Sequence, residues 1–89
     1  MQKITSNLPL SYYMELKYQI ILIPDPSGGY VATIEELPGC LSQGDSIEEA
    51  LDNIAEAKEL WLECTYENKQ EIELPRTSGN FERYIIRYI

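Results

Sequence analysis

Alternation of apolar and polar side chains predicts an antiparallel sheet in the first half of the chain. Residues 16–23 (LKYQIILI) place apolar or aromatic side chains at every even position, which is the period of a strand. Residues 30–35 (YVATIE) are aromatic and β-branched, and the Pro- and Gly-rich turn at 24–29 makes them a returning strand. A turn at 37–39 (LPG) then leads into a short third strand over 40–43.

A different period predicts one long helix over residues 46–68. Ser46 and Glu49 have the spacing of a capping box, in which each side chain accepts a hydrogen bond from a backbone N–H at the helix start. The mostly apolar side chains that follow recur at helical spacing and form one stripe. Such a stripe normally faces the core, so we expect it to pack on the sheet. Its members are Ile47, Ala50, Leu51, Ile54, Ala57, Trp61, Leu62 and Thr65.

The flanking segments predict smaller elements. Residues 7–15 are expected to form one short helical turn, residues 69–80 a polar linker, and residues 81–89 (FERYIIRYI) a closing strand. The predicted fold class is α+β: a short N-terminal helical turn, then β-β-β-α-β, with one long helix packed on an antiparallel sheet. Eighty-nine residues make a single domain, 1–89, whose core is expected to span 16–68.

The chain is acidic, with fifteen Asp and Glu residues against seven Lys and Arg and a formal net charge of −8. A field of this sign repels phosphate backbones and attracts basic partners, which makes direct nucleic-acid binding by this chain doubtful. Residues 46–68 carry seven of the acids and one lysine, Lys58. Like-charged neighbours four residues apart, such as Glu59 and Glu63, each cost the helix roughly 0.2–0.5 kcal/mol.

Two explanations fit the acidic helix. Acidity can serve solubility alone, but a surface with only that purpose normally intersperses both signs of charge. The uncompensated repulsion therefore favours a carboxylate stripe that binds a cationic partner. The partner-binding residues expected on the helix are Glu48, Asp52, Glu56, Glu59 and Glu63.

The residue inventory argues against catalysis. The chain has no histidine, which removes Ser-His-Asp and Cys-His triads and most zinc sites. Cys40 and Cys64 form no CxxC motif and fit packed thiols in a reducing cytoplasm. The surviving enzymatic option is a two-metal site of Glu35 and Glu36 with helix acids, but those acids spread along a face instead of converging. We therefore predict a cytoplasmic, non-enzymatic protein with no cofactor, no metal and no membrane span.

Residues 28–63 (GGYVATIEELPGCLSQGDSIEEALDNIAEAKELWLE) hold a series of motifs in a specific order. They are Gly-Gly-Tyr, Glu-Leu-Pro-Gly-Cys, Gly-Asp-Ser, Glu-Glu-Ala and Trp-Leu, and together they closely resemble the core of the HicB-like antitoxins. The resemblance implies a degenerate, partial RNase H-like domain that is not catalytic. It also implies a partner: HicA, a small basic mRNA interferase whose active site these antitoxins block. Leu37, Pro38 and Gly39 join the helix acids as candidate toxin contacts on this resemblance.

The resemblance also raises a question about DNA. HicB proteins usually continue into a ribbon-helix-helix or helix-turn-helix segment that binds the operator, whereas this sequence ends at Ile89. We expect no complete DNA-binding domain, with residues 81–89 closing the sheet instead. Two alternatives to an antitoxin stay open: a structural or regulatory module that self-associates through a strand edge, and a transcriptional repressor that lacks its DNA-binding segment. Family resemblance and an exposable last strand favour a homodimer.

Overall fold

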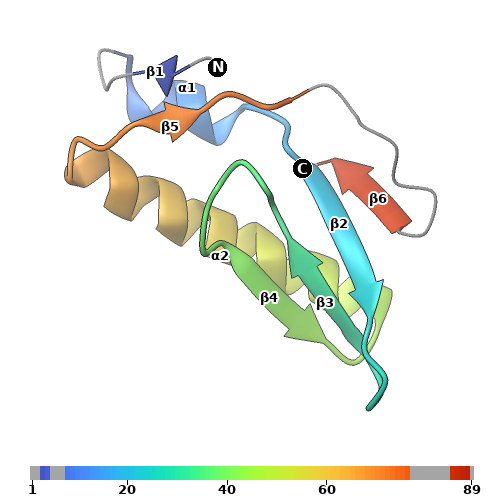
Figure 1. Cartoon of the computed structure of the whole chain (residues 1–89). Helices are drawn as coiled ribbons and strands as arrows, with labels where there is room; N and C mark the ends of the chain where they lie inside the picture. The colour runs from blue at the N-terminus through green and yellow to red at the C-terminus, as the bar shows by residue number, and fades with distance from the viewer. Residues whose placement is uncertain (1–2, 5–7, 77–84, 89) are drawn as a thin grey trace.

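A computed structural model describes residues 3–4, 8–76 and 85–88, and it places one long helix against a four-stranded antiparallel sheet (Figure 1). The strand order across the sheet is β4-β3-β2-β6. The elements are β2 (Gln19–Pro24), β3 (Tyr30–Thr33), β4 (Leu41–Gly44), the helix α2 (Ile47–Glu67) and β6 (Ile85–Tyr88). The predicted α+β class and the order β-β-β-α-β are therefore confirmed.

Strand β2 lies inside the sheet, paired with both β3 and β6. Ile20 and Leu22 are fully buried in the core, as the sequence predicts. The opposite face is only partly exposed, because Gln19 and Ile21 are also buried, whereas Ile23 is 37% exposed. The strand begins at Gln19 and not at Leu16, because the preceding residues connect the sheet to a short helix. In that connection the Leu16 N–H donates to Tyr13 O at 3.2 Å.

The start of α2 confirms the predicted N-cap. The backbone N–H of Glu49 donates to Ser46 Oγ at 3.1 Å. The Glu49 carboxylate in turn accepts from the N–H of Asp45 at 2.5 Å, one residue before the partner that a capping box uses. Gly44 ends β4 directly against this turn, where a Cβ atom would come within 2.4 Å of Ala50 N. Because Gly44 has no side chain, the end of β4 can pack closely against the first turn of α2.

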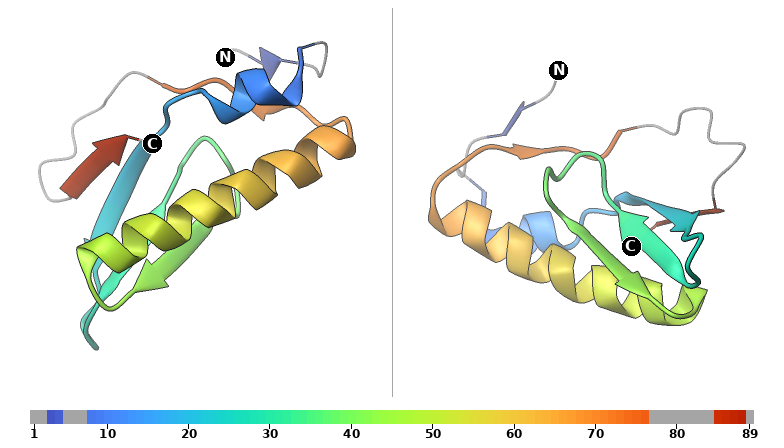
Figure 2. Two further views of the ribbon diagram at one scale, coloured as in Figure 1. Left: turned by 180° about the vertical axis from the view of Figure 1, so that it is seen from behind. Right: turned by 60° about the horizontal axis from the view of Figure 1, so that its bottom comes forward.

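A second, two-stranded sheet lies at one end of the molecule with the short helix α1 (Leu10–Met14) (Figures 1 and 2). It pairs β1 (Lys3–Ile4) with β5 (Ile72–Glu73), Ile4 opposite Ile72. The sequence predicts a polar linker over 69–80, so this strand is a correction. Ile72 is 1% exposed and belongs to the core.

The described part of β6 runs antiparallel to β2, with Ile86 opposite Ile21. It falls within the closing strand predicted for 81–89, of which residues 81–84 and 89 lie outside the described residues. Within the described residues, no helix combines the length and apolarity that crossing a bilayer requires.

Candidate protein-binding surface

Six carboxylates lie on the outer side of α2, and we call them the acidic face. At about 100° per residue, they fall within an arc of about 100° on the helix. All six are exposed, because they lie opposite the stripe that α2 turns toward the sheet. Seen from behind, α2 lies in front of the sheet, so this side faces solvent (Figure 2). The acidic face consists of Glu48, Asp52, Glu56, Glu59, Glu63 and Glu67.

Lys58, the lysine of this helix, does not balance the acidic face. It is buried among the inward-facing residues of α2, with 6% of its surface exposed. Its Nζ donates to Leu16 O at 2.9 Å and lies 5.5 Å from the centre of the Tyr18 ring. Burial lowers the pKa of Lys58, and the nearby positive charge of Lys17 lowers it further. Attraction to Glu59 raises this pKa again, but the ammonium itself lies inside the protein and not among the six exposed carboxylates.

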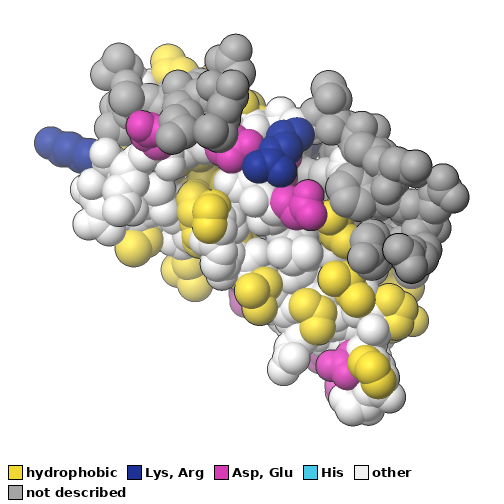
Figure 3. All heavy atoms as spheres, viewed as in Figure 1, with side chains coloured by type: hydrophobic (Ala, Val, Ile, Leu, Met, Phe, Trp, Pro, Cys, Tyr) yellow, Lys and Arg dark blue, Asp and Glu magenta, His cyan; other side chains and the backbone are white. Residues whose placement is uncertain are grey.

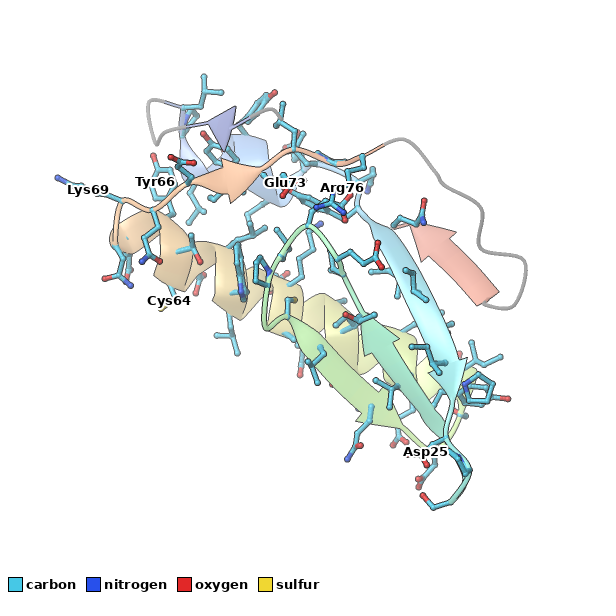
Figure 4. The ribbon with its side chains drawn as sticks, viewed as in Figure 1. Asp25, Cys64, Tyr66, Lys69, Glu73 and Arg76 are labelled. Carbon is cyan, nitrogen blue, oxygen red and sulfur yellow. The ribbon has the colours of Figure 1, made fainter. Side chains whose placement is uncertain are left out.

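Where the structure describes ion pairs, they lie away from the acidic face. Arg76 pairs with Glu73 at 2.7 Å and approaches Glu35 at 3.9 Å, and no described lysine or arginine pairs with the six helix acids. Figure 4 shows Glu73 and Arg76 side by side above the turn that precedes β4. The outer side of β2, β3 and β4, seen in Figure 3, carries scattered hydrophobic side chains and few carboxylates. Unpaired acidity is thus concentrated on one side of α2.

The second predicted contact region is the turn at 37–39, and the structure divides it. Leu37 is fully buried, so its side chain belongs to the core and is withdrawn from any partner, whereas Pro38 and Gly39 are exposed. The turn is closed by Cys40 N–H donating to Leu37 O at 2.9 Å. Gly39 has φ +85°, a conformation that residues with a side chain rarely adopt.

Trp61 joins this turn to the helix. Its Nε1–H donates to Pro38 O at 2.7 Å, while its ring packs against the core. The predicted helix stripe thus includes Trp61, but the residue also fixes the position of the exposed turn beside α2. Two regions that are separate in sequence become neighbours, although the acidic face itself points away from the turn.

Two functional features were not predicted from the sequence. Lys58 occupies a core position between Ile54 and Leu62, four residues from each, and this spacing is the signal that could have revealed its burial. Glu36 is 4% exposed, and its Oε2 accepts from the backbone N–H of Arg76 at 2.7 Å. That contact spans forty residues of sequence, so no local pattern could have revealed it.

The structure also bears on the two-metal alternative. The Glu36 carboxylate accepts a hydrogen bond from the segment after β5, on the side of the protein away from the acidic face. Among the described residues, no three His, Cys, Asp or Glu side chains are placed to share a metal ion. A polar hollow of about 430 Å³ near the start of α2 includes Asp25, Asp45 and Glu49. There, backbone and side-chain hydrogen bonds from Ser27 lower the pKa of Asp25, and Glu49 serves the N-cap.

Comparison with known proteins points to one family. Residues 18–84 match the model of the HicB-like antitoxins of bacterial toxin-antitoxin systems. A UPF0150 protein of Synechocystis is 40% identical over 57 residues, which cover 64% of this chain and 78% of that protein. A UPF0150 protein of Thermoplasma acidophilum is 39% identical over 57 residues, 64% of this chain and 83% of its own. Antitoxin HicB of Escherichia coli K12 is 27% identical over 70 residues, covering 79% of this chain but 51% of that protein.

Proposed function

Because this chain belongs to the HicB-like antitoxin family, we propose that it neutralises a basic HicA-type mRNA interferase by covering the toxin's active site and RNA-binding surface. The observation that carries the proposal is the acidic face, which presents six exposed carboxylates on a helix whose one lysine, Lys58, is buried. A toxin that binds RNA presents positive charge to phosphates, and a row of carboxylates can take the place of those phosphates.

The energetic argument favours binding over solubility alone. The pairs Glu48/Asp52, Asp52/Glu56, Glu59/Glu63 and Glu63/Glu67 together cost about 1–2 kcal/mol. A cationic partner removes that cost when it binds, so the repulsion stored in the free protein adds to the affinity of the complex. Charge complementarity of this kind acts more strongly on the association rate than on the dissociation rate.

The proposed contact surface comprises Glu48, Asp52, Glu56, Glu59 and Glu63, with Pro38 and Gly39 at a second point of contact. Leu37 contributes from inside, by anchoring the turn in the core. The role is one of binding, in line with the antitoxin family, and it requires neither cofactor nor metal. Since an mRNA interferase acts where mRNA is translated, the proposal places the complex in the cytoplasm.

Co-expression with a small basic protein encoded by an adjacent gene, the expected place of a HicA-type toxin, tests the proposal when it is scored by growth and by co-purification. We expect rescue of growth and a stable complex. Charge reversal at Asp52, Glu56, Glu59 and Glu63 should abolish rescue while the fold survives, because these side chains lie off the buried stripe. A neighbour that stays toxic and forms no complex would contradict the antitoxin role.

A matched pair of single variants separates the acidic face from overall charge. Glu59→Lys and Glu15→Lys both change the formal net charge from −8 to −6 and both replace an exposed residue. We expect Glu59→Lys to slow association with the toxin several times more than Glu15→Lys, since close charge pairs dominate the rate. Equal effects would mean that overall charge, and not the acidic face, steers binding.

One observation favours a second candidate function, a self-associating module. Among the described strands of the main sheet, β4 lies at an edge, and Leu41 on it is 60% exposed. An open strand edge with an exposed apolar residue can pair with a second copy. Light scattering of the Leu41→Lys variant and of the unaltered chain tests for self-association through β4. A variant that no longer forms a dimer but still rescues growth from the toxin would separate self-association from the antitoxin role. A DNA-binding repressor stays an alternative, and that role would require a DNA-binding segment.

A further inference from the structure

A groove of about 540 Å³ lies where three segments meet: the turn before β4, the last turns of α2, and the stretch leading into β5. We call it the Trp61 groove. It is distinct from the acidic face, because its helix residues lie on the side of α2 that turns toward Pro38. The groove is lined by Glu36, Pro38, Trp61, Thr65, Gln70, Glu71 and Glu73.

The apolar wall of the groove is held in a fixed position. Trp61 donates its Nε1–H to Pro38 O at 2.7 Å, so its polar atom is already satisfied and its ring surface is what it offers to the groove. A tryptophan ring is the side chain that attracts a cation most strongly. Pro38 is exposed beside it and extends the apolar surface.

The remaining walls are acidic. Glu36, Glu71 and Glu73 all line the groove, and none of its described lining residues is basic. Glu36 is 4% exposed, and its Oε2 accepts from the backbone N–H of Arg76 at 2.7 Å. A carboxylate can accept about four hydrogen bonds, so such a bond leaves capacity for a donor in the groove. Glu73 is already paired with the Arg76 side chain at 2.7 Å, and this side chain also approaches Glu35 at 3.9 Å (Figure 4). Glu73 is therefore not counted among the groups that would hold a further cation.

We propose that the Trp61 groove receives an arginine side chain of the protein partner, with the guanidinium stacked on Trp61 and bonded to Glu36 and Glu71. This inference rests on the proposed function, because it identifies the chemistry by which a basic partner is held. Arginine fits better than lysine for two reasons: its planar cation stacks on aromatic rings, and its five donors can bond several carboxylates at once. A guanidinium is also less strongly hydrated than an ammonium, so it loses less on entering a partly apolar groove.

The experiment uses the fluorescence of Trp61, which is the one tryptophan of the chain and lies in the groove. N-acetyl-arginine amide is titrated into the whole protein, with N-acetyl-citrulline amide as a probe of the same shape without charge. We expect a saturable change with the arginine probe and none with citrulline. Glu71→Gln should weaken arginine binding about tenfold, the value of one charged hydrogen bond. Glu15→Gln, at the C-terminal end of α1, removes the same charge from an exposed position and should leave binding unchanged within a factor of about two.

Three outcomes would overturn the inference: equal responses to arginine and citrulline, equal weakening by Glu71→Gln and Glu15→Gln, or tighter binding of N-acetyl-lysine amide than of the arginine probe. Toxin capture is scored separately by co-purification. If the protein captures the toxin but its groove, probed in the free protein, responds equally to arginine and citrulline, this inference is overturned and the proposed function stands. Selective arginine binding by a protein that captures no toxin supports the arginine specificity of the groove and overturns the proposed function.

Discussion

Lys58 shows at the scale of one residue how a charged side chain can serve a core. Its Nζ donates to Leu16 O, the carbonyl of the stretch that leads into β2, and also lies over the Tyr18 ring, 5.5 Å from the ring centre. Tyr18 in turn donates its hydroxyl to Glu73 O at 2.6 Å. Three segments, α2, the entry to β2 and β5, are thus held together through two side chains. Replacing Lys58 by a residue without a donor leaves the Leu16 carbonyl without this partner.

The lowered pKa of Lys58 leads to a prediction about pH. Burial disfavours the charged form, so the folded protein releases this proton below 10.5, the ordinary value. Between the folded pKa and 10.5 the unfolded chain binds more protons, and this group therefore makes stability rise with pH. The raised pKa values of Tyr18 and Cys40 act in the opposite direction.

Two measurements check this prediction. In an NMR titration, the Lys58 side-chain resonance should have its midpoint below 10.5. In urea unfolding, the stability difference between the unaltered chain and Lys58→Met should move in favour of lysine as the pH rises toward 10.5, since the contributions of Tyr18 and Cys40 largely cancel between the two proteins. A midpoint at or above 10.5 would contradict the burial of the ammonium.

Individual residues divide clearly into those that the sequence reveals and those that it does not. The helical period places the acidic face on the solvent side and Ile54 and Leu62 in the core, because local geometry alone decides those directions. The same period assigns Lys58 to the core, but a lysine reads as a surface residue unless a partner for its charge is known. Leu37 shows the converse, since a residue of an exposed turn is fully buried.

Among the elements, α2 is the one whose stability and proposed function oppose each other. Glu63 lies four residues from both Glu59 and Glu67, so it takes part in two repulsive pairs. Glu63→Lys turns both pairs into attractive ones, and we expect it to raise the free energy of unfolding by about 1 kcal/mol at low salt. The same change should weaken toxin binding, because it places a cation in the middle of the acidic face.

Urea unfolding at low and high salt measures the first effect, with Glu63→Gln as the control. The glutamine removes both repulsions without adding attractions, so its gain should be about half as large. Both gains should shrink as salt screens the charges. A Glu63→Lys variant that is less stable than the unaltered chain at low salt would show that the helix carboxylates do not repel one another as proposed.

The junction between β4 and α2 gives a prediction about packing. A Cβ at Gly44 would lie 2.4 Å from Ala50 N and 2.8 Å from Glu49 C, both backbone atoms that cannot rotate away. We expect Gly44→Ala to cost about 1–3 kcal/mol, in the range of overpacked sites. Ser46→Ala, which removes the N-cap oxygen two residues later, should cost about 1 kcal/mol. Chemical denaturation of the two variants measures which substitution lowers the free energy of unfolding more. A smaller loss for Gly44→Ala than for Ser46→Ala would mean that the strand and the helix can move apart at this turn.

The elements that the sequence predicts well are those whose patterns are local. The strands β2, β3 and β4 follow from alternation and turns, and α2 follows from its cap and its period. Strand β5 does not, because Ile72 and Glu73 form a strand only by pairing with β1 at the other end of the chain. Two residues are too few to show a period, so their structure depends entirely on tertiary contacts.

At the scale of the whole molecule, salt should act in opposite directions on folding and on binding. With a net charge of −8 and six unpaired carboxylates on one helix face, the free protein is destabilised by its own charge. Raising the ionic strength screens that repulsion, because the Debye length falls from about 10 Å at 0.1 M to about 3 Å at 1 M. We therefore expect the midpoint of thermal unfolding to rise with added sodium chloride.

The same screening removes the attraction that steers a basic toxin toward the acidic face. Association measured by biolayer interferometry should slow at least about tenfold between low salt and 0.5 M, whereas the dissociation rate should change much less, because contacts formed in the complex are less exposed to solvent ions. The variant with Asp52, Glu56, Glu59 and Glu63 reversed is the control, and its association rate should lose this salt dependence. A rate that is insensitive to salt in the unaltered protein, together with an unfolding midpoint that does rise, would show that the carboxylates repel one another but do not guide the toxin.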